Sequence, residues 1–277
     1  MPPPRPLCAM TLPAPGFVPP VDLNGRAILV TGASGGLGRA LSLAMAARGA
    51  TVVLHGRVVR KLEALYDEIV ALGAPEPTIL PLDLAAAGPE EASTAASALA
   101  AQLGRLDALL HVAATLGSLG PLEHQSFDAW QKVLRVNLAA PMLLTRALLP
   151  LLLDAPDASV VFTLDHRARD PRAYWGAYGA SKAGLAALAA TFADECDLRA
   201  NLRVNAVIPG PMRSPLRMLT HPGEDKSVLP PPEALVPLYV YLVSGQPKAD
   251  SGCGYDAWAW LSGRPAGVPL VAAPARL

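Results

Sequence analysis

Two side chains four residues apart, Tyr178 and Lys182, have the residue types and the spacing for proton chemistry. On a helix they share one face, where the lysine ammonium lowers the pKa of the phenol toward neutrality and can also hold a ribose hydroxyl. A tyrosine and a lysine at this spacing are frequent by chance, and Tyr174 lies nearby. The pair therefore indicates a function only together with the other motifs of the chain.

A glycine loop at residues 31–38 follows an apolar run directly and opens a helical pattern. In such a loop the first glycine permits a tight turn, a later one lets backbone amides approach a pyrophosphate, and the last lets the helix lie close to the strand. This context predicts a nicotinamide dinucleotide site rather than an ordinary turn. The loop residues expected at the cofactor are Gly32, Ser34, Gly35, Gly36, Leu37 and Gly38.

The residues after the next apolar run indicate which nicotinamide cofactor is bound. Sites for the unphosphorylated cofactor usually carry an acid about 20 residues beyond the glycines, to hold the ribose hydroxyls. Here the chain has His55, Gly56 and Arg57, and no acid comes before Glu63. The planar guanidinium of Arg57 can bind a 2′-phosphate through two hydrogen bonds. We therefore expect NADP(H) in preference to NAD(H), the alternative for Arg57 being a solvated charge at the start of a helix.

Short β-branched or leucine-rich runs alternate with longer runs rich in alanine and leucine. The short runs predict strands near residues 27–31, 51–55, 78–82, 106–112, 159–164 and 203–208, with a last one near 255–260. The longer runs predict helices near residues 36–48, 58–72, 90–103, 127–152, 177–199 and 232–243. We therefore predict one α/β domain, a Rossmann-type doubly wound parallel sheet flanked by helices on both faces. Ligands bind such sheets at the carboxyl ends of the strands.

Composition limits the partners of this domain. Of the 277 residues, 52% are hydrophobic and 17% are charged, the formal net charge is zero, and no long basic block occurs. These values predict one large core and no nucleic-acid partner. The apolar run 138–153 contains two prolines, Thr145 and Arg146 and is too short to span a bilayer, so no membrane partner is expected.

The cysteines and the two ends of the chain complete this outline. Cys8, Cys196 and Cys253 fit neither a zinc spacing nor a disulfide framework, which favours a reducing cytoplasm and no metal site. Residues 1–21 hold eight prolines and no secretory apolar core, so we expect a solvated tail, with Met10 as an alternative start. We expect the domain over residues 22–262 and a poorly ordered tail over 263–277.

Together with Tyr178 to Lys182, the glycine loop resembles that of the classical short-chain dehydrogenase/reductase family, over nearly all of residues 23–261. Val136-Asn137, residues 175–178, Pro209-Gly210 and residues 237–239 look most like the YciK-type oxidoreductases within it. The resemblance implies an NAD(P)(H)-dependent oxidoreductase acting on a small carbonyl or alcohol substrate. In that family the tyrosine exchanges a proton with the substrate oxygen while the nicotinamide exchanges a hydride.

The resemblance gives roles to further residues. Asn137 matches an asparagine whose backbone helps order a proton-relay water, the alternative being a buried amide satisfied by neighbouring backbone. Pro209 and Gly210 begin the loop that meets the nicotinamide, and Ser214 takes the place of a threonine that binds the carboxamide. Residues 212–228 are expected to form a substrate lid.

Two other stretches, after the third and fourth predicted strands, are expected at the cofactor. Asp83 and Leu84, after the third predicted strand, are an expected adenine contact, although Asp83 can equally cap the next helix. In residues 111–114 the family usually has Asn-Asn-Ala-Gly, whereas this chain has His-Val-Ala-Ala. Ala113 keeps the family residue, but the β-carbon of Ala114 predicts weakened cofactor binding if a glycine is needed there.

Asp165 is the main departure from the family, which places a serine thirteen residues before the tyrosine to polarise the substrate carbonyl. A carboxylate accepts hydrogen bonds only, so it repels a developing alkoxide and raises the Tyr178 pKa. Carbonyl reduction is then restored only if Asp165 is protonated and donates, or if Thr163 or His166 supplies the donor. Otherwise Asp165 is a surface loop residue in a site that no longer reduces carbonyls.

Three functions therefore stay open from the sequence. The first is an NADP(H)-dependent oxidoreductase that uses Tyr178, Lys182 and Asn137. The second is a catalytically impaired cofactor-binding protein, and the third is a lyase or epimerase with Tyr178 as its base.

The long helices at 127–152 and 177–199 carry more apolar residues than one sheet face needs. They predict a homodimer or homotetramer, the alternative being a large monomer in which both are well buried.

Overall fold

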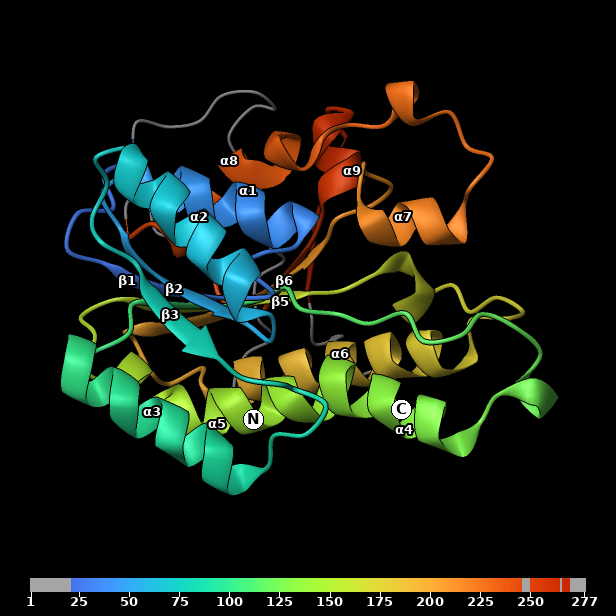
Figure 1. Ribbon diagram of the computed structural model, residues 1–277, viewed down its shortest axis with the longest axis horizontal. Coiled ribbons are helices and arrows are strands. Elements are labelled where there is room, and N and C mark those ends of the chain that lie inside the picture. Colours follow the sequence, from blue (N-terminus) through green and yellow to red (C-terminus); the bar gives the residue numbers. More distant parts are fainter. Residues whose placement is uncertain (1–20, 246–249, 265, 270–277) are drawn as a thin grey trace.

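A twisted eight-stranded sheet forms the centre of the computed structural model, which describes residues 21–245, 250–264 and 266–269 (Figure 1). The strand order is β3-β2-β1-β4-β5-β6-β7-β8. Strands β1 to β7 pair in parallel, and β8 is antiparallel to β7. The strands are β1 Ala27–Thr31, β2 Thr51–Gly56, β3 Thr78–Pro81, β4 Ala108–His111, β5 Ala158–Thr163, β6 Leu202–Ile208, β7 Cys253–Asp256 and β8 Gly267–Pro269. The predicted doubly wound α/β fold is confirmed.

Helices cover both faces of the sheet, with α1, α2, α8 and α9 on one side and α3, α4, α5 and α6 on the other (Figure 1). The α-helices are α1 Gly36–Ala46, α2 Val59–Ala71, α3 Pro89–Leu103, α4 Phe127–Leu134, α5 Ala140–Leu153, α6 Gly176–Glu195, α7 Pro215–Thr220, α8 Val236–Val243 and α9 Ala257–Leu261. A π-helical turn, Arg135–Ala139, joins α4 to α5, and short 3-10 turns lie at Leu122–His124, His166–Ala168, Lys226–Val228 and Pro232–Leu235. The lid segment 212–228 thus includes α7, which the sequence did not indicate.

The alternation of side chains along each strand divides the core into two layers. Successive residues of a strand point to opposite faces, and all five residues of β1 are buried. Ile28 and Val30 pack in the cluster that contains α1 and α8, whereas Leu29 packs in the cluster with α5 and α6. Because the central strands are apolar on both faces, little room is left for polar groups except at the strand ends.

The end of the chain differs from the prediction. The strand expected near residues 255–260 is β7, which stops at Asp256 because its carboxylate accepts a hydrogen bond from the Ala259 amide (3.0 Å) and so caps α9. Gly267–Pro269 form β8 within the stretch expected to be a poorly ordered tail. The rest of that tail, 270–277 and residue 265, and residues 1–20 lie outside the described residues.

Two further sequence expectations are changed by the structure. Cys253 is disulfide-bonded, which the cysteine spacing did not predict, and Cys196 is free and buried. The apolar run 138–153 is the end of a 27-residue helical stretch, Phe127–Leu153, which is the one candidate membrane span among the described residues by length and composition. Its second half, α5, packs on β4, β5 and α3, as expected for a core helix of a sheet layer.

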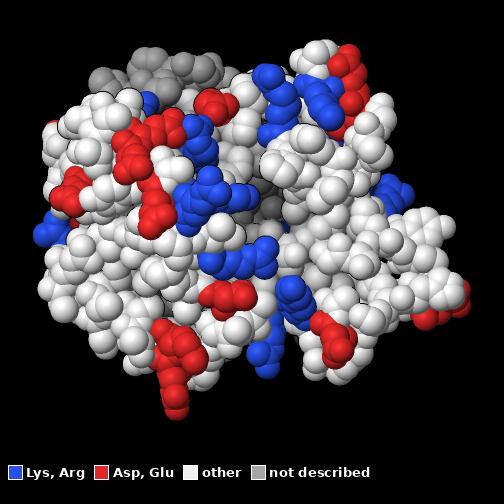
Figure 2. All heavy atoms as spheres, in the orientation of Figure 1, with Lys and Arg blue, Asp and Glu red and all other residues white. Residues whose placement is uncertain are grey.

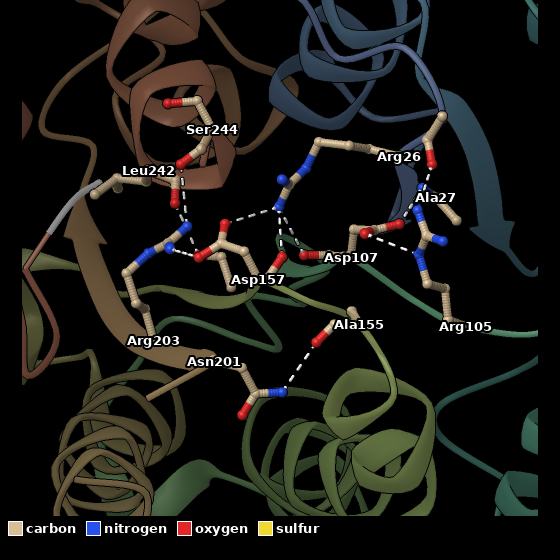
Figure 3. A network of polar contacts seen from close by, with 12 residues as sticks. Arg26, Ala27, Arg105, Asp107, Ala155, Asp157, Asn201, Arg203, Leu242 and Ser244 are labelled. Carbon is tan, nitrogen blue, oxygen red and sulfur yellow. Dashed lines mark hydrogen bonds and ion pairs between the residues drawn. The ribbon is translucent and has the colours of Figure 1, made fainter. Parts of the chain in front are cut away.

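A network of arginine and aspartate side chains ties the strands together at their amino ends, opposite the ligand end (Figure 3). Asp157 accepts hydrogen bonds from Arg26 (3.3 Å) and from Arg203, whose side chain is only 2% exposed. Arg26 also donates to the Asp157 carbonyl oxygen (2.8 Å), and Asp107 accepts from the Ala27 amide (2.8 Å). The network therefore connects β1, β5 and β6 through groups that are mostly shielded from water.

Replacing Asp157 with alanine leaves the buried Arg203 guanidinium without its carboxylate. We expect Asp157→Ala to lower the free energy of unfolding by about 3 kcal/mol, because breaking one partner of a buried ion pair leaves an uncompensated charge. Urea denaturation measures this difference. The control is Glu68→Ala, which breaks the exposed pair with Arg39 and should cost less than about 1 kcal/mol. Equal losses in the two variants would contradict the structural role of Asp157.

Candidate active site

A cavity of about 900 Å³ opens where the central strands end, between the glycine loop and the loops after β2, β4, β5 and β6. Figure 2 shows the hollow on this face, with lysine and arginine side chains along its border. The predicted site residues that line the cavity are Gly32, Ser34, Gly35, Gly36, Leu37, Gly38, Arg57, Asp83, Leu84, Ala113, Asp165, Tyr178, Lys182, Pro209, Gly210 and Ser214. Asn137 is fully buried beneath it. The structure thus brings the expected residues to one place.

The glycine loop has the shape that a pyrophosphate requires. Gly32 has a φ of +68°, and a β-carbon there would lie 3.0 Å from the Ala113 Cα. A β-carbon on Gly38 would overlap the carbonyl oxygen of Gly32. No side chain caps α1, which begins at Gly36, so its first amides are left for a ligand. Glycine at these two positions thus allows the loop to pack closely against Ala113 and the start of α1 to pack closely against the loop.

The part of the cavity next to the end of β2 carries a positive charge, that of Arg57. Arg57 directly follows β2 and is exposed, and among the described residues it makes no ion pair or hydrogen bond. Asp83 also lines the cavity, and its carboxylate accepts from the Ala85 amide (3.0 Å). Helix α3 begins later and is capped through Glu91, so Asp83 stabilises a turn and does not cap that helix.

Asn137 organises the floor of the site. Its Oδ1 accepts from the Thr115 amide (2.8 Å), while its Nδ2 donates to the Thr115 carbonyl oxygen (2.9 Å) and to Ser181 Oγ (3.0 Å). The side chain therefore holds the loop after β4 against α6. Asn137 lies in the π-helical turn Arg135–Ala139, and such turns are frequent at functional sites.

The altered run 111–114 keeps the loop in place through other contacts. Thr31 Oγ1 accepts from the amides of Val112 (2.9 Å) and Ala113 (3.1 Å), and the His111 ring stacks on Phe162 at 4.9 Å. Ala114 does not have a positive φ, so the glycine of the family is not needed for backbone conformation there.

Tyr178 and Asp165 face each other at the inner end of the cavity. The Tyr178 hydroxyl donates to Asp165 Oδ2 at 3.1 Å, and Asp165 Oδ1 accepts from the Arg167 amide at 2.8 Å. Lys182 lies on the same helix face as Tyr178, and its Nζ donates to the Thr163 carbonyl oxygen at 2.8 Å. The carboxylate thus occupies the place beside the phenol where a substrate oxygen would be polarised.

The electrostatics of this group differ from the sequence expectation for Tyr178 and Lys182. Burial raises the Tyr178 pKa well above its usual value, and the nearby negative charge of Asp165 and its hydrogen bond raise it further. Burial lowers the Lys182 pKa to about 8, partly opposed by Asp165. The expectation that Lys182 brings the phenol pKa toward neutrality is therefore wrong, whereas the expected effect of Asp165 is confirmed. Tyr178 is a neutral phenol at physiological pH.

Both substitute donors suggested by the sequence, Thr163 and His166, line the cavity, but each faces another partner. The Thr163 hydroxyl is hydrogen-bonded to the Tyr239 hydroxyl at 2.9 Å, within the sheet layer. His166 lies toward Asp256, with 4.0 Å between Nε2 and Oδ2. Asp165 is half-buried and in contact with Tyr178, so it is not a loop residue remote from the chemistry.

His55, Trp175 and His221 also line the cavity and were not predicted as site residues from the sequence. His55 is 2% exposed, its Nδ1 accepts from the Gly32 amide (3.3 Å), its Nε2 has no partner, and burial lowers its pKa to about 4. Trp175 lies 5.7 Å from the Tyr178 ring and 6.4 Å from the His221 ring, between ring centroids. The signal for His55 is a polar residue in an apolar strand, but no sequence pattern places His221 against Trp175.

Comparison with known proteins agrees with this geometry. The family model described as short chain dehydrogenase matches residues 26–225. The chain belongs to the short chain dehydrogenase family. The uncharacterized oxidoreductase YciK of Escherichia coli K12 is 40% identical over 235 residues, which cover 85% of this chain and 92% of YciK. The resemblance drawn from the motifs is therefore confirmed.

Two solved structures of this short chain dehydrogenase fold contain a cofactor. One, from Shigella flexneri 2a and complexed with NADP, is 38% identical with a TM-score of 0.82, covering 85% of this chain and 98% of its own. Another, from Escherichia coli CFT073 and complexed with NADPH, is 39% identical with a TM-score of 0.82, covering 86% and 99%. No cluster that could hold a metal ion occurs among the residues described.

The buried Lys182 ammonium makes stability depend on pH. The lysine binds its proton with a pKa of about 8 in the folded protein and 10.5 in the unfolded chain. Between these values the unfolded state holds more protons, so stability rises with pH. We expect the folded protein to gain about 3 kcal/mol relative to Lys182→Met between pH 8 and pH 10.5. Urea denaturation across this interval measures the gain, and parallel curves for the two proteins would contradict it.

Proposed function

We propose that the protein is an NADP(H)-dependent oxidoreductase that moves a hydride between the nicotinamide and a small-molecule substrate. The glycine loop, the uncapped start of α1 and the cavity of about 900 Å³ support cofactor binding. The single observation that carries the redox assignment is that Tyr178 and Lys182 lie on one face of α6, at the inner end of that cavity. NADPH, when bound, supplies the hydride, and the residues of the chain orient it and manage the proton.

The preference for the phosphorylated cofactor rests on Arg57. Its guanidinium is exposed beside the cavity and unpaired among the described residues, and Lys61 lies on the same border. Within the cavity wall no carboxylate stands directly after β2, where an acid would repel a 2′-phosphate. Two cationic side chains at this place favour NADP(H) over NAD(H) through charge-assisted hydrogen bonds.

Replacing Arg57 with alanine tests the cofactor preference. We expect Arg57→Ala to weaken NADPH binding by at least about tenfold, since a hydrogen bond to a charged group contributes roughly 1.5–3 kcal/mol. NADH binding should change by less than about twofold. Fluorescence titration measures both, with Arg60→Ala as the matched control, because Arg60 is exposed but does not line the cavity. An equal loss for NADPH and NADH would refute a contact with the 2′-phosphate.

The contact between Tyr178 and Asp165 sets the limits of carbonyl chemistry in this site. A ketone oxygen needs hydrogen-bond donors as it gains negative charge, but the phenol proton is directed to Asp165 Oδ2 (3.1 Å). A raised Tyr178 pKa also makes the phenol a weak acid. This observation favours a second candidate, a cofactor-binding protein with little turnover of ketones, which would bind NADPH without oxidising it steadily.

Restoring serine at position 165 separates these two candidates. We expect Asp165→Ser to increase kcat/KM for ketone reduction by about a hundredfold, because a hydroxyl donor replaces an acceptor beside the oxyanion. NADPH binding should stay the same. Steady-state oxidation of NADPH with a panel of aldehydes and ketones measures the effect, and Asp165→Asn is the control for loss of charge alone. If Asp165→Ser instead abolishes an activity of the native protein toward ketones, Asp165 itself serves carbonyl reduction.

Self-association and a cytoplasmic location stay predictions. The exposed apolar side chains of Leu122 and Phe127 lie at the start of the helical stretch expected to pair with a second copy, which supports the first. Sedimentation at low protein concentration distinguishes the expected homodimer or homotetramer from a monomer.

A further inference from the structure

We infer that the natural substrate is a C=N compound, an imine reduced as its protonated iminium ion or the corresponding amine oxidised, rather than a ketone or alcohol. This inference rests on the proposed NADP(H)-dependent hydride transfer and names the substrate of that same site. It stands on the hydrogen-bonding groups around the reacting position, at Asp165 and Tyr178.

Beside the Tyr178 hydroxyl, the reacting position presents a carboxylate, which can only accept hydrogen bonds. Asp165 Oδ2 accepts from Tyr178, and each carboxylate oxygen can accept more than one hydrogen bond. The Tyr178 hydroxyl donates to Asp165, the Thr163 hydroxyl is paired with the Tyr239 hydroxyl, and the Lys182 ammonium uses one of its three N–H groups on the Thr163 carbonyl oxygen. A substrate atom beside Asp165 and Tyr178 is therefore best held if it donates a hydrogen bond.

Asp165 also lacks a cationic partner. The guanidinium of Arg167 pairs with Asp170 (3.4 Å) and lies 4.8 Å above the Trp175 ring, while only the backbone amide of Arg167 reaches Asp165. Among the described residues no arginine, lysine or histidine side chain forms an ion pair with Asp165. A half-buried carboxylate in a cavity wall is stabilised by an opposite charge, and a protonated nitrogen supplies one.

An iminium nitrogen fits these groups on both sides of the reaction. The iminium N–H donates to Asp165, and so does the N–H of the amine that forms from it. An alcohol also donates a hydrogen bond to Asp165. Its oxidation, however, leaves a carbonyl oxygen that only accepts hydrogen bonds, and this oxygen then faces the Asp165 carboxylate, which also only accepts unless it keeps the alcohol proton. The carboxylate thus favours the protonated imine, which accepts a hydride more readily than the neutral one.

The step balances without a proton from Tyr178. The carbon of the iminium C=N bond forms a C–H bond with the hydride from NADPH, and the π electrons of the C=N bond become the nitrogen lone pair. The iminium is reduced to a neutral amine and NADPH is oxidised to NADP⁺. The nitrogen keeps the proton it carried, so a high Tyr178 pKa is no hindrance, and Tyr178 and Asp165 act by holding the nitrogen.

The test compares matched pairs of C=N and C=O substrates, pyrroline with cyclopentanone and dihydroisoquinoline with tetralone, using native protein, Asp165→Ser and Asp165→Asn. Steady NADPH oxidation gives kcat/KM for each. We expect the ratio of imine to ketone reduction to be at least about a hundredfold higher in the native protein than in Asp165→Ser. Asp165→Asn keeps the shape but not the charge, so it should lose imine reduction as well, with NADPH binding unchanged in both variants.

Several outcomes would overturn the inference. They are no NADPH oxidation by the native protein with either imine, an equal or higher rate with the matched ketone, imine reduction retained in Asp165→Asn, or faster oxidation of cyclopentanol than of pyrrolidine with NADP⁺. Failure of the proposed function gives a different result. In that case the native protein does not bind NADPH, or no variant oxidises it with any substrate, whereas ketone reduction by Asp165→Ser keeps the proposed function and removes only the C=N assignment.

Discussion

Burial of the parallel sheet on both faces is the constraint on which the site depends. With apolar side chains above and below β1, β4 and β5, polar groups are confined to the two ends of the strands. One end holds the Arg26, Asp157 and Arg203 network, whose ion pairs join neighbouring strands. The other end has backbone amides, a free arginine and a carboxylate facing solvent-filled space, and for that reason binding and chemistry lie there.

At that end, one substitution changes the character of the site without changing its architecture. Asp165 occupies the position expected for a serine. Its Oδ1 accepts a hydrogen bond from the Arg167 amide and so caps the 3-10 turn His166–Ala168. Its Oδ2 accepts a hydrogen bond from the Tyr178 hydroxyl. Donors at the reacting position are thereby converted into acceptors, while the glycine loop and Lys182 remain as in a hydride-transferring site. We therefore expect cofactor binding and the choice of substrate to depend on separate groups.

The sequence predicted most of the fold, because alternating apolar runs and the glycine loop are local patterns. The residues it predicted for the site, apart from the buried Asn137, all line the cavity, since the carboxyl ends of parallel strands meet at one edge. It failed where contacts join distant segments, as with β8, α7 and the His221 ring beside Trp175. The sequence predicted a Tyr178 pKa lowered by Lys182, whereas burial raises it. A four-residue spacing shows that two side chains share a helix face but not how deeply they are buried. The rise in the Tyr178 pKa caused by Asp165 could be predicted, because it follows from the negative charge of the carboxylate.

The contacts of Asn137 have a consequence for the order in which the protein folds. This one side chain joins Thr115 and Ser181, which lie 22 and 44 residues away from it along the chain. Closing such loops costs entropy before any contact compensates for it. We therefore expect these bonds to form only after α4, α5 and α6 have packed on the sheet. The floor of the cavity is therefore completed late. A partly folded chain can hold the glycine loop and its helix, which are local, but not the assembled site, and competence to bind the whole cofactor marks the end of folding.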